Sequence, residues 1–127
     1  MDRIKNPPSV KLIVGFIFKE DRLFTKAKAT LEKRLGQIDF QSRTLPFEHT
    51  DYYEKELGQN LKRAFVSFKK LVAPESLPET KITTNKIEKS LSTGKKRTVN
   101  IDPGYLDLAK LCLASAKDYR HRIYLDK

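Results

Sequence analysis

Hydrophobic and polar positions along the chain predict that it opens with a strand followed by a helix. Residues 9–18, SVKLIVGFIF, are almost continuously apolar, which is typical of a strand covered on both faces. Residues 20–36 then carry a single apolar stripe with helical spacing, formed by Phe24, Ala27, Leu31 and Leu35. Acidic residues in the first turn, basic residues in the last turn and Gly36 at the end support this helix.

The pattern continues with two strands, a helix and another strand. Alternating apolar residues within 37–47 predict a second strand that Pro46 ends. Residues 60–72 predict a third strand, whose alternating apolar positions are Ala64, Val66 and Phe68. A weaker helical stripe predicts a helix from 77 to about 92, although its threonines are poor helix formers. Residues 97–101 predict a fourth strand.

This order of elements predicts the fold class. Strand, helix, strand, strand, helix, strand is the split βαβ pattern of ferredoxin-like α+β sandwiches. We therefore predict one α+β domain over residues 1–127, with further strands at 110–115 and 121–125. Because the sequence stops two residues after Leu125, the last strand either lies at a sheet edge or belongs to a longer protein.

The stretch Asp102-Pro103-Gly104-Tyr105 has the composition of a turn. Proline suits the second position of a type II turn, and glycine supplies the positive φ of the third. Asp102 can either brace its own turn or face a ligand. In the functional interpretation, Asn100, Asp102 and Tyr105 line the mouth of a pocket at the end of the fourth strand.

Composition and charge favour a small soluble protein. The sequence has 26 lysines and arginines against 16 acids, which gives a net charge of +10 that is spread over both halves. Such a field attracts phosphate, RNA or acidic partners, and it also keeps a small domain in solution. Cys112 is the only cysteine, no apolar run approaches a membrane span, and no secretory signal is seen, so we predict a cytoplasmic protein without membrane contact.

Five segments together resemble one protein family. They are VKLIVG (10–15), FEHTDYYEKELG (47–58), LKRAFVSFKKL (61–71), RTVNIDPGYL (97–106) and KDYRHRIYL (117–125). In this order and spacing they resemble the bacterial and archaeal family called domain of unknown function 4416, over almost the whole chain. The resemblance supplies no substrate. It implies that members continue past the last segment with a GIYAEVTL-like strand and a TYPDY-like segment, so that this chain is C-terminally truncated.

Several ionisable residues are candidates for acid–base chemistry. His49, His121, Asp51 and Asp102 can form an acid–base group if the fold brings them together. Their spacing matches no metal-binding motif, so we predict neither a metal site nor a cofactor. Tyr52 lies beside Asp51 in the acidic connection 48–58, which is predicted to contain a helical turn closed by Gly58, and one phenol there can be exposed.

Two basic segments are candidates for phosphate contacts. The loop around Tyr119 carries three cations that can bind phosphate oxygens, while the ring can stack on a base: Lys117, Arg120 and Arg122. Residues 92–97, STGKKR, faintly resemble the end of a phosphate-binding loop. They lack its first glycine and carry Lys96 where Ser or Thr binds Mg²⁺, which excludes a Walker-type site.

Two classes of function, and a third interpretation, follow from these residues. The favoured hypothesis is a module that binds a phosphorylated ligand, either a nucleotide or RNA, through the cationic loop and Tyr105 or Tyr119. The alternative is a small enzyme for a phosphorylated or carboxylated metabolite, with Asp102 or Asp51 as base and His121 or His49 as its partner. A structural or self-associating role is the third interpretation, and the sequence leaves the oligomeric state open.

Overall fold

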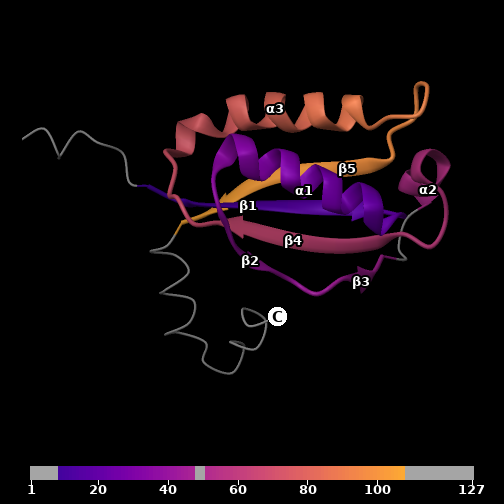
Figure 1. Cartoon of the computed structure of the whole chain (residues 1–127), viewed down its shortest axis with the longest axis horizontal. Coiled ribbons are helices and arrows are strands. Elements are labelled where there is room, and N and C mark those ends of the chain that lie inside the picture. The colour runs from indigo at the N-terminus through magenta and orange to yellow at the C-terminus, as the bar shows by residue number, and fades with distance from the viewer. Residues whose placement is uncertain (1–8, 48–50, 108–127) are drawn as a thin grey trace, which may run out of the picture.

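A computed structural model describes residues 9–47 and 51–107. The elements follow in the order β1 (Lys11–Phe18), α1 (Asp21–Leu35), β2 (Ile38–Gln41), β3 (Leu45–Pro46), α2 (Asp51–Leu57), β4 (Lys62–Phe68), a 3₁₀ turn (Pro74–Ser76), α3 (Leu77–Ser90) and β5 (Val99–Leu106). In Figure 1, α1 and α3 lie along the sheet, and α2 lies at the end where β1 finishes. The described residues contain no helix with the length and apolar character needed to cross a membrane.

The sheet has five strands, and every paired neighbour is antiparallel. Its order is β2-β4-β1-β5, and the short β3 extends the β2 side of β4. The prediction that the fold combines helices with a sheet is confirmed. The predicted strands at 110–115 and 121–125 lie outside the described residues.

The second predicted strand is divided into β2 and β3. The register shifts between Ile38 and Phe40, and the chain then leaves the ladder around Ser42. Ser42 bridges the gap, because its backbone N–H donates to Phe65 O at 2.8 Å and its Oγ accepts from Phe65 N at 2.8 Å. β3 ends at Pro46, as the sequence predicts.

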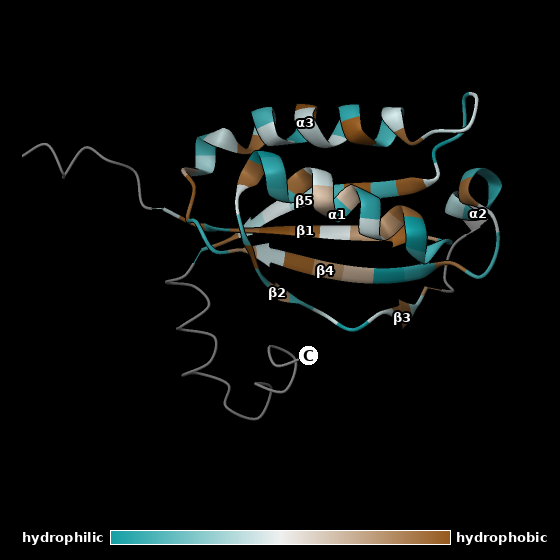
Figure 2. Ribbon diagram, in the orientation of Figure 1, coloured by the Kyte–Doolittle hydropathy of each residue, from teal (hydrophilic) through white to brown (hydrophobic). Residues whose placement is uncertain are grey.

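The main core lies between the sheet and helices α1 and α3. Alternate residues of β1 and β4 face it, which agrees with the two-residue period of a strand. Figure 2 shows the hydrophobic colouring along β1 and the central part of β4. The core side chains with almost no solvent exposure include Leu12, Val14, Phe16, Phe18, Leu31, Val66, Phe68, Val99 and Ile101.

Helix α3 forms although threonines occupy its buried face. Thr80 and Thr84 are buried, and each hydroxyl donates to a backbone carbonyl one turn back, at 3.2 Å to Ser76 O and 2.9 Å to Lys81 O. These bonds satisfy the hydroxyl groups where water is excluded. Packing against β5 therefore overrides the weak helix propensity of the sequence.

The turn predicted at residues 102–105 is wrong, because these residues continue strand β5 as far as Leu106. Asp102 pairs with Gly15 and Tyr105 with Leu12, and Gly104 has no positive φ. The strand tolerates Pro103 because β5 is an edge strand. Ile101 N–H points away from β1 and donates to Glu88. In an extended strand the nitrogen of Pro103 points in the same direction as that of Ile101. Pro103 therefore removes no hydrogen bond between β5 and β1.

Candidate functional site

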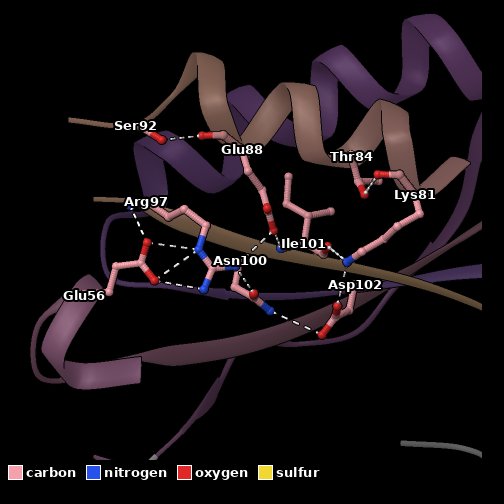
Figure 3. A network of polar contacts seen from close by, with 9 residues as sticks. All are labelled: Glu56, Lys81, Thr84, Glu88, Ser92, Arg97, Asn100, Ile101 and Asp102. Atoms are coloured by element: carbon pink, nitrogen blue, oxygen red, sulfur yellow. Dashed lines mark hydrogen bonds and ion pairs between the residues drawn. The ribbon is translucent and has the colours of Figure 1, made fainter. Parts of the chain in front are cut away.

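A carboxylate–guanidinium pair joins helix α2 to the start of β5. Glu56 accepts hydrogen bonds from the Arg97 backbone N at 2.8 Å, from Nη2 at 2.9 Å and from Nε at 3.1 Å (Figure 3). Bonding to Arg97 holds the pKa of Glu56 below its usual value and raises the pKa of Arg97. The pair therefore fixes the hairpin that precedes β5 against the end of α2.

The same guanidinium starts a chain of polar contacts along β5. Arg97 Nη1 donates to Asn100 Oδ1 at 2.6 Å, and Asn100 Nδ2 donates to Asp102 Oδ2 at 3.3 Å. Lys81 on α3 completes the chain with an ion pair to Asp102 Oδ1 at 3.2 Å. Figure 3 shows these side chains following one edge of the sheet. The carboxylate of Asp102 is therefore already paired with a cation.

Glu88 is a buried acid that satisfies the open edge of β5. Its Oε2 accepts a hydrogen bond from Ile101 N at 2.7 Å and lies 3.5 Å from Arg97 Nη1. Burial raises the pKa of this carboxyl group above its usual value, and the Ile101 N–H and the Arg97 charge oppose that effect. Glu88 thus replaces the strand that would otherwise bond the outer edge at Ile101.

A cavity of about 180 Å³ adjoins this network, where three connections meet. We call it the loop-end pocket. Its walls come from the start of α1, the end of α2 and the hairpin before β5, namely Lys19, Glu20, Leu23, Glu56, Leu57, Thr93, Lys96, Arg97 and Thr98. The hairpin is closed by hydrogen bonds between Thr93 and Lys96 in both directions, with Gly94 at a φ of +62°.

Two cations of the loop-end pocket, Lys19 and Lys96, form no direct ion pair among the described residues. Arg97 is held by Glu56, and Glu20 bonds to Arg22, but Lys19 and Lys96 form no ion pair with any carboxylate in the described part of the chain. The stem of Lys19 lies close to Gly58, where an added Cβ would be 3.4 Å from Lys19 Cδ. The positive charge of Lys96 contributes to the lowered pKa of Glu56. The lining residues thus include three cations and two carboxylates, which leaves the pocket with a small excess of positive charge.

The start of α1 brings charge of both signs to this end, since Glu20 and Asp21 are acidic and its first N–H groups are partly positive. Glu20 occupies the N-cap position in an extended conformation, and no side-chain hydrogen bond caps the helix. The first N–H groups of a helix carry a partial positive charge that favours anions. Thr98 also faces the pocket, where its hydroxyl donates to Leu91 O at 2.7 Å and keeps lone pairs free to accept.

The residues predicted at the end of the fourth strand are only partly brought together. Asn100 and Asp102 bond to each other, but Asn100 is buried by its neighbours. Asp102 pairs with Gly15 and Tyr105 with Leu12, a residue of the helix-covered core, so the two side chains point to opposite faces of the sheet. Tyr105 is exposed.

The side chains of the other predicted site residues lie outside the part of the chain that the structure describes. Asp51 and Tyr52 lie in helix α2, which confirms the predicted helical turn in this connection, but their side chains are outside the described residues. The remaining candidates fall wholly outside the described residues: His49, Lys117, Tyr119, Arg120, His121 and Arg122. Within residues 9–47 and 51–107, no group of three His, Cys, Asp or Glu side chains is arranged to hold a metal ion.

The sequence interpretation missed Lys19, Glu56 and Glu88. Lys96 and Arg97 belong to the segment STGKKR, for which the sequence excludes a Walker-type site and predicts no other role. The sequence offers one signal for Glu88. This residue lies four positions after Thr84 and therefore on the same face of the helix. A charged side chain buried there needs a hydrogen-bond or ion-pair partner. No local signal marks Glu56 and Arg97, because 41 residues separate them.

Comparison with known proteins agrees with the resemblance seen in the sequence. A family model described as Domain of unknown function (DUF4416) matches residues 8–127. No curated protein and no solved structure matches the chain. The match spans nearly the full sequence and includes every element of the sheet as well as the loop-end pocket. The chain therefore belongs to the DUF4416 family.

Proposed function

We propose that this protein is a binding module for a small phosphorylated ligand, which it holds in the loop-end pocket. The observation that carries this proposal is the pair Lys19 and Lys96, two cations on one cavity without ion-pair partners among the described residues. Separated lysines without a carboxylate partner are suited to an anion that brings two charges, such as a phosphoryl group.

The size of the pocket limits what it can hold. A volume of about 180 Å³ is well below that of a typical pocket for a whole drug-sized ligand. It accommodates a phosphoryl group and the atoms next to it, so the rest of a nucleotide or sugar phosphate would extend into solvent. The buried side chains of Leu23 and Leu57 form the apolar part of its lining and lower the local dielectric beside the phosphoryl group.

A nucleotide is favoured over RNA as the ligand of this pocket. The net charge of +10 attracts both. A polynucleotide, however, needs a track of cations along its backbone, whereas the loop-end pocket offers one local site. The predicted roles of Lys117, Arg120 and Arg122 in phosphate binding stay part of this proposal, as does a cytoplasmic location.

We also propose that the fold is the ferredoxin-like split βαβ arrangement. The order β2-β4-β1-β5 supports this assignment, because β4 is inserted between β1 and β2, the two strands joined through α1. In this arrangement the loop after β1 and the loops before β4 and β5 lie at the same end of the sheet. The loop-end pocket lies at that end.

Titration over a salt series tests the proposed function. The full chain is titrated with inorganic phosphate, pyrophosphate and a nucleoside monophosphate, and heat is measured by calorimetry. We expect saturable binding that weakens as salt rises, because the interaction is an ion pair at a partly open site. Absence of binding to all three probes at low salt would refute the proposal. The enzymatic alternative stays a prediction: Asp102 forms an exposed pair with Lys81, and the side chains of the other candidate residues lie outside the described part of the chain.

A further inference from the structure

The sheet has a second face, which α1 and α3 do not cover. Core residues of β1 and β4 such as Leu12 and Val66 point to the helices, so the residues between them point the other way. We call this second surface the open face. From the strand registers it comprises Lys11, Ile13, Gly15, Ile17, Phe40, Leu45, Arg63, Phe65, Ser67, Asn100, Asp102, Gly104 and Leu106.

The open face exposes several large apolar side chains. Phe65 is 37% exposed, Phe40 50% and Leu106 37%. Phe65 lies across the middle of the face, where its ring would be 3.0 Å from a Cβ on Gly15. Charged groups lie beside them, because Arg63 lies 5.0 Å from the centre of the Phe65 ring and Asp39 pairs with Lys11. The open face is therefore a mixed surface, and exposed rings of this size on it favour contact with another surface.

One end of the open face already has a cover within the described residues. Ile17 is buried there in a small cluster with Leu57 of α2 and Leu61. Phe47 and Tyr53 pack against the same cluster. The rest of the face, from Gly15 toward Ile13, has no such helix above it among the described elements.

The chain continues beyond Asp107 from this same region of the molecule. Leu106, near the end of β5, pairs with Lys11 and so lies on the open face. Twenty residues follow Asp107. Apolar residues alternate within them at Leu111 and Leu113 and again at Ile123 and Leu125. Alternation of this kind presents one apolar surface when a segment is extended.

The length of this segment suits the surface. Twenty extended residues reach about 65 Å, whereas four strands side by side are only about 20 Å wide. The segment can therefore cross the sheet and return. Because the segment is tethered to β5, docking has no translational cost, and burial of its apolar residues with Phe65 and Phe40 offsets the conformational entropy lost when it is ordered.

We propose that residues 108–127 dock on the open face and bury Ile13, Phe40, Phe65 and Leu106 beneath the alternating apolar residues of that segment. The sheet is then covered on both faces, as the nearly continuous apolar sequence of β1 requires. This inference is independent of the phosphate site, because the loop-end pocket has no residue in common with the open face.

Hydrogen exchange on the full chain tests this docking. We expect the backbone amides of 110–115 and 121–125 to exchange at least tenfold more slowly than the same segment would in an unfolded peptide. Phe65→Glu should abolish that protection. Ile82→Glu is the matched control, because Ile82 is an exposed apolar residue on the outer side of α3. Absence of protection in the wild-type chain would overturn the proposal.

A second variant keeps the test valid if Phe65→Glu does not fold. Ile123→Glu changes only the segment and leaves the described fold unaltered. It should increase the fluorescence of an apolar dye such as ANS several-fold, because the open face becomes accessible. If protection of the segment instead depends on protein concentration and light scattering shows a dimer, a second copy covers the face. If only added single-stranded RNA protects Phe65, the occupant is a nucleic acid. Either result would contradict docking of the chain's own segment.

Discussion

Glu56 and Arg97 are separated by 41 residues, yet the carboxylate accepts hydrogen bonds from both the backbone and the side chain of the arginine. The contact closes the end of the sheet where α2 meets the hairpin before β5. It also forms one wall of the loop-end pocket. Because Glu56 compensates Arg97, the charge left for a ligand comes from Lys19 and Lys96.

Glu56→Gln is expected to lower the free energy of unfolding by about 1 kcal/mol at pH 7, because the pair is partly exposed and the value for a buried ionic bond does not apply. The pKa of Glu56 is lowered in the folded protein, so its contribution is present above the unfolded value of 4.5 and is lost as pH falls through the folded pKa. Urea unfolding at several pH values measures this.

The matched control is Glu75→Gln, at an exposed residue of the 3₁₀ turn before α3. We expect its effect to be small at every pH. A stability difference between wild type and Glu56→Gln that does not shrink below pH 4.5 would mean that the carboxylate charge is not what joins α2 to the hairpin.

Glu88→Gln should show the opposite dependence on pH. Burial raises the pKa of Glu88, so its stabilising contribution is largest below the unfolded value of 4.5 and is lost as pH rises through the folded pKa. The glutamine can still accept the hydrogen bond from Ile101 N and carries no charge to bury. The variant should therefore gain stability relative to wild type between about pH 4 and pH 7. A constant difference over that range would contradict the assignment.

Alanine substitutions at Gly104 in β5 and at Gly15 in β1 test whether residues 102–105 are extended or form a turn. Gly104→Ala should change the free energy of unfolding by less than about 1 kcal/mol, because φ is not positive and nothing lies within 4 Å of the added Cβ. Gly15→Ala should cost about 1–3 kcal/mol, because its Cβ would meet the ring of Phe65 at 3.0 Å. Thermal unfolding of both variants measures the two changes in stability. A large loss of stability in Gly104→Ala would contradict the extended conformation and favour a turn at residues 102–105.

Much of the fold followed from hydrophobic periodicity. The stripe through Phe24, Ala27 and Leu31 predicted α1, and the alternation of Ala64, Val66 and Phe68 predicted the buried side of β4. These patterns are local, and the core depends on them directly. The turn prediction for residues 102–105 was wrong. The composition of Asp-Pro-Gly suits a turn, but the pairing of β5 with β1 keeps these residues extended.

The candidate site followed much less from the sequence. Lys19, Glu56 and Lys96 come from three connections, and only the sheet order brings those connections to one end. No spacing along the chain reports such a meeting. The sequence also does not predict that β5 is an edge strand. That position explains why Glu88 is buried beside it and why the strand tolerates Pro103.

Amide chemical-shift mapping with pyrophosphate on three forms of the full chain, namely wild type, Lys96→Ala and Lys95→Ala, tests the central claim most directly. The two variants remove the same charge from neighbouring positions, but only Lys96 lines the loop-end pocket. We predict shifts centred on residues 19–23 and 93–98, at least tenfold weaker binding for Lys96→Ala and a change below about twofold for Lys95→Ala. Equal weakening in both variants, or shifts spread over the whole surface, would contradict a site at this pocket.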